Sequence, residues 1–317
     1  MFSREHGRAD IAGRARRTLK LANAPVSWGV SEATGGRQPA PEAFLREVAA
    51  CGYRGIELGP LGYLATEPDA LLGSLRRHDL QLVGAFCPVT LHDRARREAA
   101  LADADRLIEL LAACGATMLV LADAGADRRR SVAGRVPADG SAGLTDADWS
   151  VFADGANEVA RRAAARGLAT SFHPHAATYV ETPGEIEALL GRTDPSLIGL
   201  CLDTGHVTYG GGDPVAVARR YAARISHVHL KDVRRAILER TRDAGGSFAT
   251  AVADGVFAPL GAGDVDFAGV FAALGPGYDG WLVVEQDRVV AETDAPTAAG
   301  DDALRSVRYL EGRTDRA

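Results

Sequence analysis

One local pattern recurs along the chain and constrains its fold more than any other feature. A helix-like segment ends at a glycine, and an apolar run follows within a few residues. The pattern occurs at VAACGYRGIEL (48–58), LAACGATMLVLAD (111–123), AAARGLATSF (163–172) and ALGPGYDGWLVVE (273–285). Glycine adopts the left-handed conformation that ends a helix, and the apolar run is typical of a buried parallel strand. Because parallel strands need crossover connections, the pattern predicts helices alternating with the strands of a parallel sheet.

The same reading of the whole chain gives eight strands, with helical segments between them and after the last. The predicted strands are 21–27, 54–58, 80–86, 117–121, 168–173, 198–203, 225–230 and 281–285. Helical spacing is clear where Leu101, Ala104, Ile108 and Leu111 step by three or four residues. Eight strands alternating with eight helices predict an α/β protein, a single (β/α)8 TIM barrel over residues 21–317.

An open doubly wound sheet is the alternative architecture. It predicts a glycine-rich phosphate turn after the first strand, but VSWG (26–29) stands there, and the sequence contains no GxGxxG or GK[ST] motif. Two long connections, 122–145 and 231–264, follow predicted strands. In a barrel they lie on the face that carries binding loops, so the barrel is the favoured arrangement.

Composition narrows the class of partner and the compartment. The chain has 36 basic and 42 acidic residues, a net charge of −6, which argues against a nucleic-acid or membrane partner. Residues 1–20 are rich in arginine but have no apolar core, so we expect a loosely ordered N-terminal arm rather than a secretory signal. The cysteines form no C-x-x-C pair, which favours free thiols in a cytoplasmic protein. A homo-oligomer is compatible with all of this.

Titratable residues gather at the carboxyl ends of the predicted strands. Six of the eight strands end in such a group, although a buried strand should be apolar. The groups are Glu57, Asp123, His173 with His175, Asp203 with His206, His229 with Lys231, and Glu285. In a barrel these ends converge on one mouth, where the active sites of this fold lie.

Four of these groups end strands five to eight in order and form a set of two imidazoles and two carboxylates: His173, Asp203, His229 and Glu285. Such a set suits a divalent ion such as Mn²⁺, Co²⁺, Fe²⁺ or Zn²⁺, and the lack of thiolates argues against a structural zinc site. Any one of them alone is more often a helix cap or a hydrogen-bonded core group, but the four together predict a metal site. Spacing leaves open which of His173 and His175, and which of His227 and His229, is the ligand, because the two members of each pair point to one face.

Longer phrases resemble a known superfamily. GLCLDTGH (199–206), HVHLKD (227–232), PLGAGDVDF (259–267) and WLVVEQD (281–287) resemble the sugar isomerase/epimerase superfamily with a xylose-isomerase-like barrel. Other phrases are similar to the inosose dehydratases of myo-inositol catabolism: NAPVSWG (23–29), GIELGPLGY (55–63), GAFCPVTLHD (84–93), FHPHAATYVET (172–182) and CLDTGHVTYGGGDP (201–214). The resemblance implies removal of water from a ketocyclitol such as scyllo-inosose (2-keto-myo-inositol), with Mn²⁺ or Co²⁺ as the ion. It places the ligands at His173, Asp203, His229 and Glu285.

The chain departs from the wider superfamily at one ligand. Its epimerases commonly carry two glutamates that face the substrate as paired bases, whereas this chain has His173 at the first of these positions and keeps only Glu285. A one-base reaction is therefore favoured. We expect Glu285 to act as the base or to orient it, and His206 or Lys231 to protonate the leaving hydroxyl.

The remaining polar residues of the mouth are assigned to the small polyol or keto-sugar substrate. We expect the ring hydroxyls to meet Trp28, Glu57, His92, Asp123 and His175. A supporting role for Glu57 is equally open, and Trp28 is more typical of a pocket wall. The basic run at 128–130 is expected to be a solvated face rather than a phosphate clamp, which favours an unphosphorylated substrate.

Two other functions remain open. One is a metal-dependent sugar epimerase or ketose isomerase on the same barrel. The other is a barrel that binds a polyol without any reaction.

Overall fold

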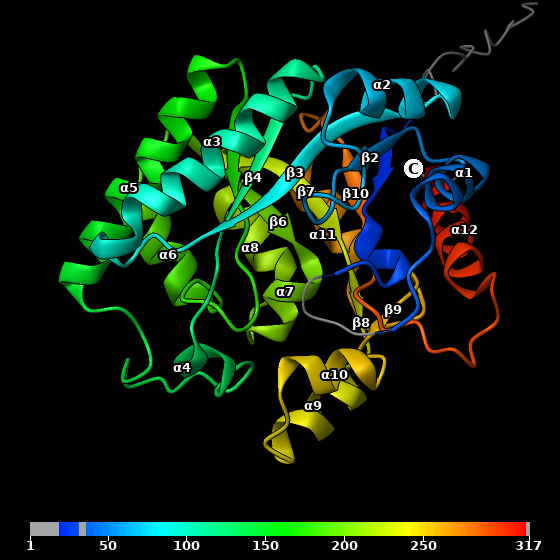
Figure 1. Cartoon of the computed structure of the whole chain (residues 1–317). Coiled ribbons are helices and arrows are strands. Elements are labelled where there is room, and N and C mark those ends of the chain that lie inside the picture. Colours follow the sequence, from blue (N-terminus) through cyan, green and yellow to red (C-terminus); the bar gives the residue numbers. More distant parts are fainter. Residues whose placement is uncertain (1–18, 32–35, 315–317) are drawn as a thin grey trace, which may run out of the picture.

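A closed parallel barrel forms the centre of the molecule (Figure 1). The computed structural model describes residues 19–31 and 36–314. The strands follow the order β1-β10-β7-β6-β5-β4-β3-β2. Their bounds are β1 Leu21–Asn23, β2 Gly55–Glu57, β3 Gln81–Val89, β4 Met118–Asp123, β5 Ala169–Phe172, β6 Ile198–Asp203, β7 Ile225–Leu230 and β10 Leu282–Val284. The predicted (β/α)8 fold is confirmed, while the predicted arm at 1–20 lies outside the described residues except for its last two.

Helices that connect successive strands cover the outside of the barrel (Figure 1). They are α1 Pro41–Ala50, α2 Pro68–Arg77, α3 Arg97–Ala113, α5 Asp146–Ala165, α6 Pro183–Arg192, α8 Pro214–Tyr221 and α11 Phe267–Leu274, and α12 Ala298–Thr314 follows the last strand. Thr145 and Thr182 begin α5 and α6 with capping boxes, which satisfy the free N–H groups of the first turn. The other helical segments, besides η1 (Pro25–Trp28), are η2 Arg94–Arg96, α4 Asp127–Arg130, α7 Thr204–Tyr209, η3 Ala222–Arg224, α9 Arg235–Asp243 and α10 Phe248–Ala253.

The first strand is shorter than predicted. β1 ends at Asn23, and the 3₁₀ helix η1 (Pro25–Trp28) occupies the rest of the predicted strand 21–27. Pro25 has no N–H group for a strand ladder, so the sheet cannot continue through it. Gly29 then closes the turn at φ 76°, and a Cβ at this position would lie 2.9 Å from Val290 Cγ2.

Apolar side chains fill the barrel below its mouth. Ala22, Ala24, Val83 and Val283 form one buried cluster, and Met118, Val120 and Cys201 form another. All four cysteines of the chain are buried and free, as the sequence predicts. The interior is therefore largely a packed apolar core, although Ser171 and His227 are buried within β5 and β7.

The two long connections carry additional structure. Residues 122–145 include α4, and residues 231–264 include α9, α10 and an antiparallel pair of short strands, β8 (Asp232–Val233) and β9 (Phe257–Ala258). In Figure 1, α9 and α10 project beyond one end of the barrel, on the side where α4 lies. Arg135 joins the two connections by donating to the carbonyl oxygens of Gly245 at 3.2 Å and Gly246 at 3.4 Å.

No helix within 19–31 and 36–314 has the length and apolar character needed to cross a lipid bilayer.

The basic run at 128–130 is only partly a solvated face. Arg128 and Arg130 are exposed, but Arg129 is fully buried. Its Nη1 and Nη2 donate to the two carboxylate oxygens of Glu185 at 2.6 and 3.0 Å, and Nη2 lies 3.8 Å from Glu181 Oε2. The expectation for Arg129 was wrong because its partner belongs to α6, far along the chain. The guanidinium fastens α4 to the start of that helix.

We expect Arg129→Met to lower the free energy of unfolding by about 3 kcal/mol, because it leaves two largely buried carboxylates without their counter-charge. Arg128→Met is the matched control on an exposed neighbour and should change stability by less than about 0.5 kcal/mol. Urea denaturation of the two variants measures the difference. Equal stabilities would show that the buried pair contributes nothing.

Candidate metal centre

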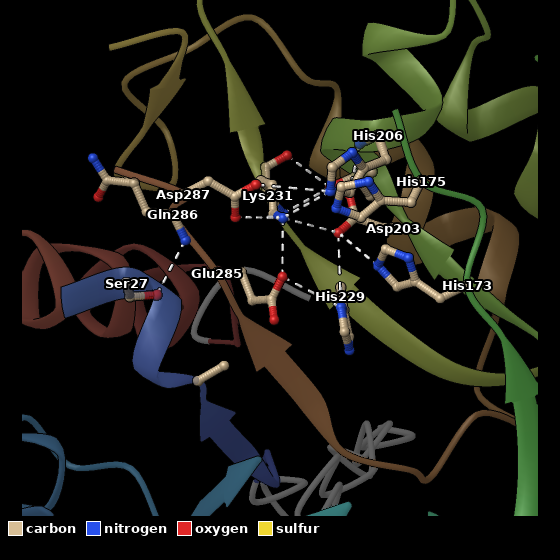
Figure 2. Close-up of polar contacts among 12 residues, drawn as sticks. Ser27, His173, His175, Asp203, His206, His229, Lys231, Glu285, Gln286 and Asp287 are labelled. Carbon is tan, nitrogen blue, oxygen red and sulfur yellow. Dashed lines mark hydrogen bonds and ion pairs between the residues drawn. The ribbon is translucent and has the colours of Figure 1, made fainter. Parts of the chain in front are cut away.

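Four predicted ligands come together at the mouth of the barrel (Figure 2). Each projects inward from the carboxyl end of its strand, since alternate strand residues face the barrel axis. Their exposed fractions are 2% for His173, 0% for Asp203, 1% for His229 and 8% for Glu285. The site is therefore almost closed to solvent, with Glu285 its most accessible member.

The distances between these groups are short. Asp203 Oδ2 lies 3.4 Å from His173 Nε2 and 3.7 Å from His229 Nδ1. Glu285 Oε2 lies 3.4 Å from the same His229 nitrogen. Asp203, His229 and Glu285 offer ligand atoms within 4.8 Å of one another, and Asp203 makes a second such group with His173 and His206. Asp203 thus belongs to both groups, and His229 belongs to two further groups, one with His173 and Cys201 and one with Glu57 and His227.

Two ligand atoms of the cluster have no hydrogen-bond partner although they are buried: Asp203 Oδ2 and His229 Nδ1. A buried carboxylate oxygen and a buried imidazole nitrogen are costly without partners. A divalent ion bound between them would satisfy both, and the mixed nitrogen and oxygen donors suit a first-row metal. The buried histidine and carboxylate cluster thus indicates a divalent metal site.

His173 and His175 have different surroundings. His173 directs Nε2 at Asp203, as described above. His175 instead places Nδ1 2.7 Å from the carbonyl oxygen of Ala176, and its ring lies over that of His206 with 3.8 Å between the centroids. The geometry therefore favours His173 as the ligand, a choice that spacing in the sequence left open.

Glu57 contacts the Nε2 atom of His229, on the side of the ring away from the other predicted ligands. Its Oε1 lies 2.8 Å from His227 Nε2 and 3.0 Å from His229 Nε2. Burial alone would raise the pKa of the Glu57 carboxyl, but the charge of His229 and the hydrogen bond from His227 lower it to about 2. A carboxylate that accepts from one imidazole nitrogen orients the other nitrogen toward a metal. Of the two roles considered for Glu57, its contacts match the supporting one.

Lys231 lies beside the ligands. Its Nζ is 2.9 Å from Glu285 Oε2, 3.5 Å from Asp203 Oδ2 and 2.7 Å from Asp287 Oδ1. Burial opposes a charged lysine, yet the three carboxylates raise the pKa of Lys231 well above its ordinary range. Sequence reasoning assigned no role to Asp287. The available signal was its position two residues after Glu285 in the phrase WLVVEQD.

His206 is the fourth neighbour of Lys231, with Nε2 3.1 Å from Nζ. Burial, together with the nearby His175 and Lys231, lowers the pKa of His206 well below its ordinary value, so the ring is neutral. Its Nδ1 accepts the amide N–H of Ala176 at 3.2 Å.

The other predicted substrate residues contact different parts of the molecule. Trp28 donates its indole N–H to Glu47 at 2.8 Å and packs against Phe44 in the helix layer. Asp123 stands at a position of β4 whose side chains point away from the barrel axis, and it accepts the amide N–H of Tyr179 at 2.9 Å. His92 lies 3.8 Å from Asp123 and lines a separate cavity of about 480 Å³. None of these contacts involves the four predicted ligands.

We expect Glu57→Gln to weaken divalent metal binding about 10–100-fold, because His229 loses the charged acceptor that orients it. Glu67→Gln replaces an exposed glutamate and serves as the control, with no change expected. Calorimetric titration of metal-stripped protein with Mn²⁺ measures both dissociation constants. Unchanged affinity in Glu57→Gln would exclude this supporting role.

Comparison with known proteins agrees with the barrel fold. A family model described as a xylose isomerase-like TIM barrel matches residues 45–310. The inosose dehydratase of Geobacillus kaustophilus (strain HTA426) is 36% identical over 281 residues, which cover 86% of this chain and 89% of that protein. The inosose dehydratase of Clostridium beijerinckii is 31% identical over 305 residues, or 93% of this chain and 97% of that protein.

Solved structures share the fold at lower identity. One described as the IOLI protein with a binding zinc atom has a TM-score of 0.68 and 15% identity, and the match covers 94% of this chain and 99% of that chain. At this identity the likeness shows the fold alone. The matched family model and the long alignments show that the chain belongs to the xylose isomerase-like TIM-barrel family, in which it is similar to the inosose dehydratases.

Proposed function

We propose that this protein is a metal-dependent dehydratase that removes water from a ketocyclitol such as scyllo-inosose. The observation that carries the proposal is the contact between Glu285 Oε2 and Lys231 Nζ at 2.9 Å, beside a ligand set with His173 in place of a second glutamate. This arrangement offers one carboxylate base and one adjacent acid. Two opposed bases, which epimerisation requires, are not built into it.

His173, Asp203, His229 and Glu285 would hold the ion. The resemblance to inosose dehydratases favours Mn²⁺ or Co²⁺, and the donor set also suits Zn²⁺ or Fe²⁺. When bound, a divalent ion supplies Lewis acidity that lowers the energy of negative charge on a ketone oxygen.

The proton transfers follow from the contact between Glu285 and Lys231. Glu285 removes the proton from the carbon next to the ketone, and the hydroxyl on the following carbon leaves as water with a proton from Lys231 Nζ. A carbon–carbon double bond remains, and the enol product tautomerises to a dione. Glu285 then returns its proton to the neighbouring Lys231, which restores both groups.

Lys231 is better placed than His206 for the acid role. The ring of His206 is covered by His175, with 3.8 Å between the centroids, and by Phe248 at 5.6 Å. Lys231 contacts Glu285 directly, whereas His206 lies near His173 and Asp203 and contacts Lys231. We therefore assign the acid to Lys231 and a positioning role to His206.

The substrate hydroxyls have fewer contacts than the sequence predicted. His175 is retained as a hydroxyl contact because its ring centroid lies 5.6 Å from that of His173. His92 and Asp123 are proposed to contact only the part of a substrate that extends to the rim. Trp28 is left out because Glu47 holds its indole N–H.

Turnover on defined substrates tests the function. Metal-loaded protein should convert scyllo-inosose to a dione, detected by its absorbance and by the loss of one water from the product mass. A product of unchanged mass from scyllo-inosose or a ketohexose would contradict the dehydratase proposal. An inverted stereocentre would indicate an epimerase, and a moved carbonyl group would indicate an isomerase. Metal-bound protein that turns over none of these compounds would indicate a binding protein.

We expect Glu285→Gln to reduce dione formation about 10³-fold, because the amide cannot accept the proton. Glu292→Gln, an exposed position later in the same connection, is the control and should retain the rate. Initial rates at saturating substrate and metal measure the effect. Retained turnover in Glu285→Gln would remove this residue from the base role.

A further inference from the structure

Lys231 shares its carboxylate partners with the proposed metal site. Its Nζ lies 2.9 Å from Glu285 Oε2 and 3.5 Å from Asp203 Oδ2 (Figure 2). These two oxygens are also the ones that face His229 Nδ1, at 3.4 and 3.7 Å. The ammonium group and a divalent ion would therefore use the same pair of anionic oxygens.

Asp287 offers the ammonium group a separate partner. Asp287 Oδ1 is 2.7 Å from Lys231 Nζ, the shortest of the three carboxylate contacts, and Asp287 is absent from the four proposed ligands. Asp287 Oδ2 also lies 3.8 Å from His206 Nε2, on the other neighbour of the lysine. Asp287 can thus hold the ammonium group without occupying a proposed ligand atom.

The backbone and the side-chain stem of Lys231 are held in place, so a change of partner would involve mainly the ammonium group at its tip. Thr204 Oγ1 accepts the Lys231 amide N–H at 2.9 Å and donates to the Lys231 carbonyl oxygen at 2.8 Å. The stem packs on Gly205, where a Cβ would lie 2.6 Å from Lys231 Cγ. A change of partner therefore consists of a small displacement of Nζ among Glu285, Asp203 and Asp287.

We propose that Lys231 competes internally with the divalent ion for Asp203 and Glu285, and that Asp287 is the positioning residue that retains the ammonium group when the ion binds. This inference rests on the proposed metal site. In metal-free protein the ammonium group holds three buried carboxylates together against their mutual repulsion. Because coupling between two ligands is reciprocal, a lysine contact that weakens metal binding is weakened by the metal to the same degree.

A double-mutant cycle on metal binding tests the proposal. Metal-stripped wild type, K231M, D287N and the double variant are titrated with Mn²⁺ by calorimetry in the absence of substrate. We expect K231M to bind about tenfold more tightly and D287N about tenfold more weakly than wild type. Since Asp287 acts through Lys231, the effect of D287N should largely disappear when K231M is also present.

A control separates competition from a general change in charge. R288M removes a positive charge near Glu285 in sequence, but Arg288 pairs with Asp302 at 3.1 Å outside the cluster. It should leave the Mn²⁺ dissociation constant unchanged. The melting temperature gives a second readout. Metal-free K231M should melt at a lower temperature than wild type, and Mn²⁺ should raise its melting temperature by more than it raises that of wild type. If K231M does not fold, K231Q takes its place, and D287N alone still tests the predicted weakening.

Two results would overturn the inference: K231M binding Mn²⁺ no more tightly than wild type, or D287N weakening it equally with and without K231M. Wild-type protein that binds no Mn²⁺ would instead overturn the metal site of the proposed function. Tight binding without dehydration of scyllo-inosose would overturn the reaction and leave the competition intact.

Discussion

The arrangement of side chains at the mouth of this barrel depends on one constraint, which is that their charges are buried away from water. Asp203, Glu285 and Asp287 are all buried, and so is the Lys231 ammonium group that faces them. Charged groups can remain in such a place only if each meets an opposite charge or a hydrogen-bond partner. The strands supply the groups, and the packed barrel keeps solvent from separating them. The buried Glu57 carboxylate meets the same requirement through its contact with His229.

Much of the fold, and the convergence of four polar side chains in it, could be predicted because polar strand ends contradict the expected apolar pattern. His173, Asp203, His229 and Glu285 each stand where a buried strand should be apolar, and the closed barrel brings them together. Their convergence needed only the alternation of side chains and the parallel order of the strands.

Other features depend on geometry that a sequence pattern does not contain. The proline in η1 ends the first strand early and turns Trp28 into the helix layer. The outward parity of β4 takes Asp123 away from the axis, a point that strand alternation could have shown. Arg129 and Glu185 are 56 residues apart, so nothing local marks them as partners. Asp287 lies beyond the end of β10, where the alternation of strand side chains no longer specifies a direction.

The filled interior of the barrel also determines how molecules reach the site. Ala22, Val83 and Val283 close the passage below the polar cluster, with Met118 and Val120 beside them. A substrate of Glu285 would therefore enter and leave from the mouth of the barrel, at the carboxyl ends of the strands. A molecule bound there would block the entry of the next one, so product release would have to precede the binding of a new substrate.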